Sequence, residues 1–385
     1  MKKLACSILL GLLAGGSASA LDLPRGQIID DVVCADDPAQ HYSLYLPSTF
    51  TPDRAWPVIL LFDAGGRGRR GVERYRAGAE RYGYIVAGSN NSRNGPWKPS
   101  LDAARAMATD VAKRFPADSR RIYTAGMSGG ARVAMMVALH PELMAGRNHG
   151  VAGVLASSAG FPPGEARESV PFPVFATAGT DDFNYLEVRA LDRALKGPRR
   201  VVIFEGGHTW LPVEAATEGI EWLELQGMAS GARPRNQPLI DDLFARRVAR
   251  AEALENSLEL MRELESIARD FGPFKNVTVL KQRVAVLAAR PDTVASLKAE
   301  RDDVAREEES TAAMLALLEE LDVDGGIAKL KARVTPLLAQ AGASEDSSSR
   351  RIARRVLTGL RASTAGIRNP ALQELLDQIS AVVTR

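Results

Sequence analysis

A serine between glycines is the first residue of this chain that could do chemistry. Gly126-Met127-Ser128-Gly129-Gly130 has the pattern G-x-S-x-G. It follows an expected strand over residues 121–125 and precedes an expected helix over residues 131–139. In such a strand–turn–helix setting the serine hydroxyl is held clear of the sheet, and glycines beside it avoid collisions in the tight turn. We therefore predict Ser128 as a nucleophile rather than as a solvated serine in a glycine-rich loop.

A serine hydroxyl becomes a good nucleophile only when a base removes its proton, and this chain has four histidines. His208 follows an expected strand over residues 201–204. It therefore lies at the carboxyl edge of a sheet, where the active-site groups of parallel-sheet enzymes gather. We predict His208 as the base. The other three are expected to be structural or exposed: His41, His140 and His149.

The imidazole in turn needs a carboxylate that fixes its tautomer and stabilises its protonated form. Asp181 and Asp182 follow an expected strand over residues 174–177, one strand before His208. Asp182 is three residues past Gly179, which gives the loop room to turn its carboxylate toward the histidine. Asp181 is better placed to cap the next helix or to accept backbone N–H groups in the turn. We favour Asp182 as the acid and keep Asp181 as the alternative.

The oxyanion that forms when a hydroxyl attacks a carbonyl carbon needs hydrogen-bond donors. One donor is expected to be the backbone N–H of Gly129, directly after the nucleophile. The other is expected in the loop after the strand over residues 58–62, where we predict Ala64 and Gly65. Two cysteines in the whole chain are too few for a Cys-rich zinc site or a disulfide framework. We expect neither a metal nor another cofactor.

Short apolar runs separated by helical patterns surround these residues. The runs cover residues 58–62, 84–87, 121–124, 151–155, 174–177 and 201–204, and helical spacing covers 101–115, 131–139, 185–195 and 213–225. This alternation predicts an α/β fold, a mostly parallel sheet with helices on both faces. Residues 27–33 and 42–46 predict an antiparallel hairpin at its start. The connection over residues 157–171 is too short for a helical lid, so the site is expected to be open.

The composition changes beyond residue 223, where phenylalanines are the only aromatic residues. Residues 227–238 are rich in Gly, Pro, Ser and Asn, as a linker is, and the chain after them has apolar residues at helical spacing. We predict a catalytic domain over residues 21–231 and an all-α C-terminal domain over residues 232–385, with paired helices of a TPR-like kind. Nothing in the second domain suggests chemistry, so it is expected to cover the site or to bind a protein partner.

Residues 1–20 have the features of a secretory signal peptide: two lysines, an apolar stretch and the cleavage pattern Ala18-Ser19-Ala20. The stretch is too short to span a membrane. We predict cleavage after Ala20 and a secreted or periplasmic protein with no membrane span. Lys and Arg number 49 against 47 Asp and Glu, a formal net charge of +2, so no basic excess points to nucleic acid.

In their order along the chain, the Gly126–Gly130 motif, the Gly179–Asp182 turn and the His208 segment resemble the α/β-hydrolase superfamily. Within it, the chain is similar to secreted esterases related to poly(3-hydroxybutyrate) depolymerases and feruloyl esterases. The resemblance covers residues 25–226. It implies an exported serine hydrolase that cleaves a small or polymeric carboxylic ester through an acyl-enzyme. Two alternatives stay open: a peptidase or amidase with the same triad, and an inert hydrolase-fold protein whose helices bind a partner.

Overall fold

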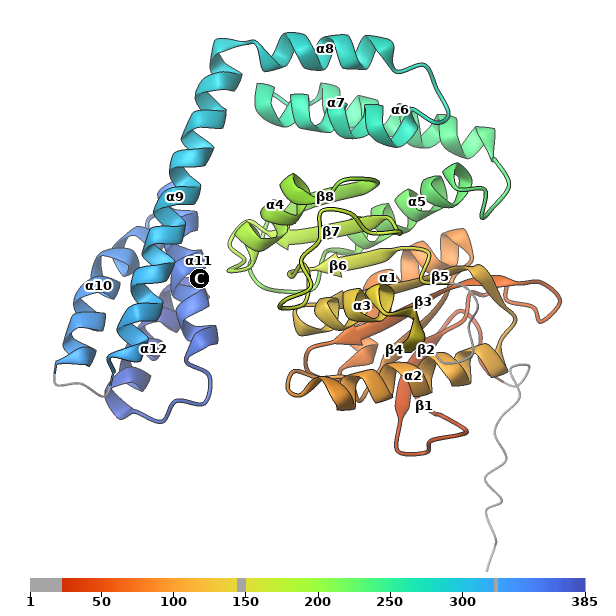
Figure 1. The fold of residues 1–385 in the computed structure, drawn as a ribbon, viewed down its shortest axis with the longest axis horizontal. Coiled ribbons are helices and arrows are strands. Elements are labelled where there is room, and N and C mark those ends of the chain that lie inside the picture. The colour runs from red at the N-terminus through yellow and green to blue at the C-terminus, as the bar shows by residue number, and fades with distance from the viewer. Residues whose placement is uncertain (1–22, 144–149, 322–324, 385) are drawn as a thin grey trace, which may run out of the picture.

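The structure is a computed structural model that describes residues 23–143, 150–321 and 325–384. The predicted signal peptide, residues 1–20, lies outside the described residues. In the described part, eight strands form one sheet in the order β1-β2-β4-β3-β5-β6-β7-β8 (Figure 1). The strands are β1 (Ile28–Val33), β2 (His41–Tyr45), β3 (Trp56–Asp63), β4 (Ile85–Ser89), β5 (Ala117–Met127), β6 (Val154–Ser157), β7 (Val174–Gly179) and β8 (Arg199–Phe204).

The sheet is antiparallel only at its beginning. β1 pairs with β2 and β2 with β4 in antiparallel register, whereas every pair from β4 to β8 is parallel. The predicted hairpin and the predicted α/β fold with a mostly parallel sheet are confirmed. Because the parallel strands run in one direction, the loops after β3, β5, β7 and β8 lie at one edge of the sheet.

Helices cover both faces of the sheet, as the apolar strands require. The helices of this half are α1 (Gly68–Tyr82), α2 (Trp97–Arg114), α3 (Gly129–Leu139), the 3-10 helix η1 (Pro141–Leu143), α4 (Tyr185–Ala194) and α5 (Val213–Ala229). Side chains alternate across β3. Val58 and Leu60 pack in a core with residues of α2, α3 and α4, while Ile59 and Leu61 pack in a second core with residues of α1 and α5.

The chain after α5 is helical, which confirms the all-α character predicted for it. Its helices are α6 (Gln237–Glu252), α7 (Ser257–Phe271), α8 (Thr278–Ala288), α9 (Pro291–Glu319), α10 (Gly326–Ala341), α11 (Ser348–Ser363) and α12 (Pro370–Val383). Several begin where a side chain caps the first turn: Asn236, Asn256, Ser347 and Asn369 each accept a hydrogen bond from a backbone N–H at their helix start.

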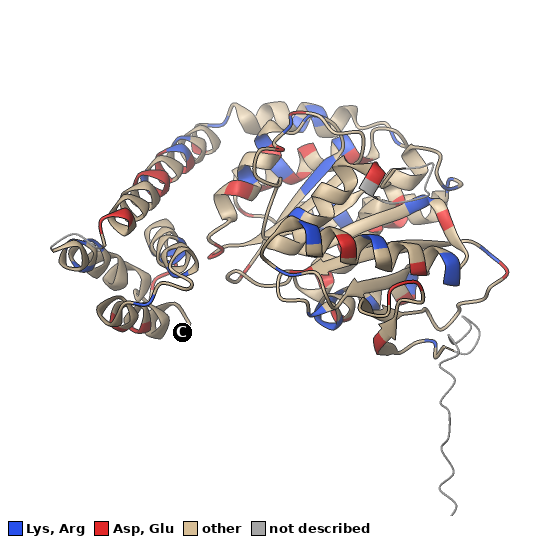
Figure 2. Cartoon of the chain, turned by 60° about the horizontal axis from the view of Figure 1, so that its bottom comes forward, with Lys and Arg blue, Asp and Glu red and all other residues tan. Residues whose placement is uncertain are grey.

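These helices form two groups, each with its own core. α6, α7 and α8 share apolar contacts with the end of α5. The last part of α9 packs with α10, α11 and α12 in a four-helix bundle, which Figure 1 shows at the end of the long helix α9. Acidic and basic residues are interspersed along both halves of the chain (Figure 2). No helix among the described residues is long and apolar enough to cross a membrane.

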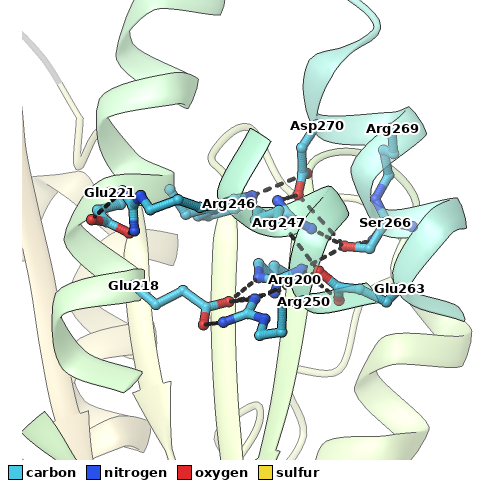
Figure 3. Close-up of polar contacts among 11 residues, drawn as sticks. Arg200, Glu218, Glu221, Arg246, Arg247, Arg250, Glu263, Ser266, Arg269 and Asp270 are labelled. Atoms are coloured by element: carbon cyan, nitrogen blue, oxygen red, sulfur yellow. Dashed lines mark hydrogen bonds and ion pairs between the residues drawn. The ribbon is translucent and has the colours of Figure 1, made fainter. Parts of the chain in front are cut away.

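A buried network of charged side chains joins α6 and α7 to the sheet (Figure 3). Arg200 of β8 donates from Nε to Glu218 of α5 at 2.7 Å, and its Nη2 lies 3.2 Å from Glu263 of α7. Trp222 of α5, 1% exposed, donates from its indole N–H to Asp270 of α7 at 3.0 Å. The predicted boundary after residue 231 falls between α5 and α6, yet packing continues across it.

Glu218 makes this network sensitive to acid. Burial alone would raise the pKa of Glu218, but the guanidinium groups of Arg200 and Arg250 outweigh it and lower the pKa to about 2. A carboxyl with a lower pKa in the folded than in the unfolded chain stabilises the fold at neutral pH. That stabilisation is lost as the pH falls from about 4.3, the unfolded value, through the folded value.

We therefore expect Glu218→Gln to lower the free energy of unfolding by about 3 kcal/mol at pH 7 and by clearly less at pH 3. Urea denaturation at the two pH values measures both differences. Glu374→Gln is the matched control, because Glu374 is exposed and pairs only with exposed Lys331 among the described residues. A destabilisation by Glu218→Gln that is the same at pH 7 and pH 3 would contradict this role for its charge.

Candidate active site

Ser128 occupies the turn between β5 and α3. Its backbone has φ 57° and ψ −123°, a conformation that non-glycine residues adopt at a cost and that is found mostly at functional sites. Gly126 and Gly130 must be glycines because other backbone atoms lie where a side chain would begin. A Cβ on Gly126 would lie 2.2 Å from the carbonyl oxygen of Gly130, and a Cβ on Gly130 would lie 2.1 Å from the carbonyl oxygen of Phe62. The turn therefore has the shape that the glycine pattern predicts.

The three residues predicted as a triad lie together in one hydrogen-bonded line. His208 Nε2 is 2.9 Å from Ser128 Oγ, and His208 Nδ1 is 2.8 Å from Asp182 Oδ1. Asp182 is fully buried and also accepts a hydrogen bond from the backbone N–H of Asn184. A carboxylate against Nδ1 places the imidazole proton there and leaves Nε2 free to accept the serine proton.

The ring of His208 is held on one side by Phe183. The two rings are stacked with their centroids 4.0 Å apart and their planes 29° from each other. Phe183 directly follows Asp182 in sequence, so one loop supplies both the carboxylate and the stacking ring. The position of the imidazole thus depends on how this loop, residues 180–184, is held.

Asp181, the alternative acid, pairs with an arginine, whereas Asp182 is the aspartate that contacts His208. Its Oδ2 lies 2.7 Å from Nε of Arg354 in α11, and its backbone N–H donates to the carbonyl oxygen of Gly206. We expected Asp181 to cap the next helix or to accept backbone N–H groups. Instead α4 begins without a side-chain cap, and the partner of Asp181 is an arginine more than 170 residues away in sequence.

The oxyanion donors predicted from the sequence differ in what they already bind. Gly129 is the first residue of α3, and the first N–H groups of a helix have no partner within it. The N–H of Gly65, in contrast, donates to the carboxylate of Asp63 at 2.7 Å. Gly65 is therefore engaged, and Ala64 remains as the predicted donor from this loop.

Asp63 is a site residue that the sequence analysis missed. Its buried carboxylate accepts from Gly65 N–H and from Arg67 Nε through Oδ1, and from the indole N–H of Trp210 at 2.8 Å through Oδ2. Trp210 lies two residues after His208, so Asp63 connects the oxyanion loop to the histidine segment. The available signal was an aspartate that ends an otherwise apolar strand.

Ser158 is a second residue that was missed. Its backbone also has φ 57°. Its Oγ donates to the carbonyl oxygen of Thr209 at 3.2 Å, while its own carbonyl oxygen accepts from the side chain of Asn184 at 2.7 Å. A strained residue held by surrounding contacts is typical of active sites. Here it joins the loop after His208 to the loop after Asp182.

Asp63→Asn is expected to lower kcat by about 10- to 100-fold, less than the loss on removing an oxyanion donor outright. Either orientation of the amide places an NH2 group against an N–H donor, of Gly65 or of Trp210. Turnover of a small activated ester measures the effect, and Asp102→Asn, at an exposed pair with Lys98 on α2, is the matched control. An unchanged kcat in a folded Asp63→Asn protein would show that the oxyanion loop does not depend on this carboxylate.

No family model and no curated protein matches this chain. Solved structures align with about half of it at low identity. An esterase of Thermogutta terrifontis with bound propionate is 16% identical over 55% of this chain and 98% of its own, with a TM-score of 0.41. A fluorophosphonate-binding serine hydrolase of Staphylococcus aureus is 17% identical over 48% of this chain and 92% of its own, with a TM-score of 0.38. An esterase of Pyrobaculum calidifontis is 15% identical over 54% of this chain and 86% of its own, with a TM-score of 0.39.

Proposed function

Starting from an α/β-hydrolase fold, we propose that this protein is a serine hydrolase that cleaves carboxylic esters. The observation that carries the proposal is the hydrogen-bonded line from Ser128 through His208 to Asp182, with distances of 2.9 and 2.8 Å. A nucleophile, a base and an orienting carboxylate in this arrangement are recognised by their geometry, whatever their order in the chain. An inert protein would have no need of a strained serine in contact with an oriented imidazole.

The proposed reaction proceeds in two halves. Ser128 Oγ attacks the acyl carbon while His208 Nε2 takes its proton, and the carbonyl oxygen becomes an oxyanion that accepts from the N–H groups of Gly129 and Ala64. The bond to the alcohol then breaks as the imidazolium returns the proton to the leaving oxygen. Water attacks the acyl-serine with His208 again as base, and the carboxylic acid leaves.

The substrate class follows from what surrounds the triad. The connection between β6 and β7 is irregular and contains no helix, so it adds no lid over the site. We infer that the site is open, as a site for small esters or for the surface of a polymeric ester needs to be. Export is part of the proposal, because residues 1–20 have the pattern of a signal peptide, and N-terminal sequencing of the mature protein for a start at Leu21 tests it.

A panel of substrates tests the activity. Purified protein is assayed with p-nitrophenyl esters of increasing chain length, a feruloyl ester, a poly(3-hydroxybutyrate) suspension and aminoacyl p-nitroanilides, each beside Ser128→Ala. We expect turnover of short esters with an initial burst of p-nitrophenol. Anilide cleavage exceeding ester cleavage would favour a peptidase or amidase, and no Ser128-dependent turnover of any substrate would refute a hydrolase.

A further inference from the structure

The loop that carries the proposed catalytic acid is contacted from the far end of the chain. Residues 180–184 connect β7 to α4, and α11 packs against them. Arg355 of α11 donates from Nη1 to the carbonyl oxygen of Thr180 at 2.7 Å. Its neighbour Arg354 lies 2.7 Å from the carboxylate of Asp181. Both contacts are made to the two residues that directly precede Asp182.

α11 also contacts the other side of Asp182. A Cβ placed on Gly359 would lie 3.5 Å from the Cβ of Phe183, so the helix backbone passes close to the residue whose ring stacks on His208. The guanidinium of Arg355 lies over the ring of Tyr185, 4.5 Å from its centroid. Asp182 is therefore flanked in sequence, before and after, by residues that α11 holds.

The two arginines are themselves fixed by the bundle. Arg355 is 7% exposed, and its Nε donates to Glu307 of α9 at 2.8 Å in a two-point contact. Arg354 donates from Nη2 to the carbonyl oxygen of Val383, at the end of α12, at 2.7 Å. A planar guanidinium with several donors suits such bridging better than the ammonium group of lysine.

We propose that the bundle of α9–α12 is a positioning element for the catalytic acid, with Arg354 and Arg355 as its positioning residues. This inference rests on the proposed function, because it concerns the same triad. Each arginine is paired with a carboxylate, Asp181 or Glu307, so the effect on Asp182 is one of geometry rather than of net charge. The loop is also held by hydrogen bonds inside the hydrolase half. The backbone N–H of Thr180, for example, donates to the carbonyl oxygen of Phe204. Loss of the bundle contacts is therefore expected to shift Asp182 rather than to release it.

Arg354→Gln and Arg355→Gln test the proposal in the full chain. We expect each to lower kcat per titrated active site by about 10-fold, since a small misplacement of a catalytic group costs up to about 100-fold. KM should stay within about 3-fold, because neither arginine is placed to bind substrate. Arg350→Gln is the matched control, because Arg350 is on the same helix and pairs with Asp346, two residues before α11 begins. Arg355→Lys, which keeps a charge opposite Glu307, should recover part of the lost kcat.

An NMR resonance of the triad distinguishes a displacement of Asp182 from a general loss of stability. The chain has four histidines, and the proton shared by His208 Nδ1 and Asp182 should give a downfield NMR resonance that Asp182→Asn removes. We expect this resonance to shift or broaden in Arg354→Gln and Arg355→Gln and to be unchanged in Arg350→Gln. A wild-type resonance together with wild-type kcat in both arginine variants would overturn the proposal.

A double-mutant cycle tests the contact itself. If Arg354 acts through Asp181, then Arg354→Gln with Asp181→Asn should cost no more kcat than the larger single change. Additive losses would refute that route. Should Arg355→Gln fail to fold, this pair and Arg355→Lys still decide the matter. Wild-type protein without Ser128-dependent turnover would refute the proposed function alone, and the resonance would then decide whether the bundle positions Asp182.

Discussion

A fluorophosphonate is expected to label the wild-type protein at Ser128, and Ser128→Ala is expected to abolish the label and lower kcat on an activated ester by about 10³-fold or more. The reason is the 2.9 Å contact between Ser128 Oγ and His208 Nε2, which makes the hydroxyl nucleophilic. In Ser128→Ala, only substrate binding and the oxyanion donors still contribute to catalysis. Mass spectrometry of the labelled peptide and steady-state kinetics measure the two effects.

The matched control for the nucleophile is Ser349→Ala. Ser349 is exposed on α11 and lies outside the hydrogen-bonded line of Ser128, His208 and Asp182, so label and kcat should stay at their wild-type values. Label that persists at another residue in Ser128→Ala would contradict the assignment. So would a folded wild-type protein that takes no label at all.

Asp182→Asn is expected to lower kcat by about 10³- to 10⁴-fold, as loss of the orienting carboxylate does in a serine–histidine–aspartate triad. The buried Oδ1 of Asp182 accepts from His208 Nδ1 at 2.8 Å. An amide is neutral, so it cannot stabilise the imidazolium as a carboxylate does, and in one orientation its NH2 group faces Nδ1 and favours the wrong tautomer. Kinetics on a short p-nitrophenyl ester, with circular dichroism as a check on folding, measure the loss.

Asp181→Asn is the paired control, because it makes the same chemical change one residue away. Its carboxylate faces Arg354 rather than the histidine, so we expect a loss of only about 10-fold, through the loop. Equal losses in the two variants, or a larger loss for Asp181→Asn, would contradict the placement of the acid.

Most of the fold could be predicted because the spacing of apolar residues and the residues typical of turns are local features of a sequence. The strand runs and the order of Ser128, Asp182 and His208 could be identified since each lies directly after an apolar run at the same edge of the sheet. Helix α1 was missed because glycines interrupt its sheet-facing side, where Val72 and Tyr75 are the large buried residues. A Cβ on Gly71 would lie 2.2 Å from the side chain of Leu61, so the helix backbone approaches the sheet closely at this point.

The remaining features depend on contacts between residues far apart in the chain. Nothing near Asp181 indicates that Arg354 is its partner, and nothing near Asp63 indicates Trp210. The linker composition of residues 227–238 correctly indicated a loop, but the loop is shorter than predicted, because residues 227–229 belong to α5 and residues 237–238 to α6. This composition does not indicate whether later helices cover the surface of α5. In the structure, α6 and α7 cover it through apolar contacts and through the hydrogen bond from Trp222 to Asp270.

The contact between Arg355 and Thr180 joins residues 175 positions apart, and this separation has a consequence for the order of folding. Closing a long loop costs more chain entropy than pairing neighbouring strands, and contacts of high sequence separation form late. The sheet and its flanking helices can assemble from nearer segments, whereas the bundle must fold and then dock. We therefore expect the chain to pass through a stage in which the sheet is complete while the aspartate loop still lacks its contacts with α11, so that the proposed active site is complete only after the C-terminal helices have docked.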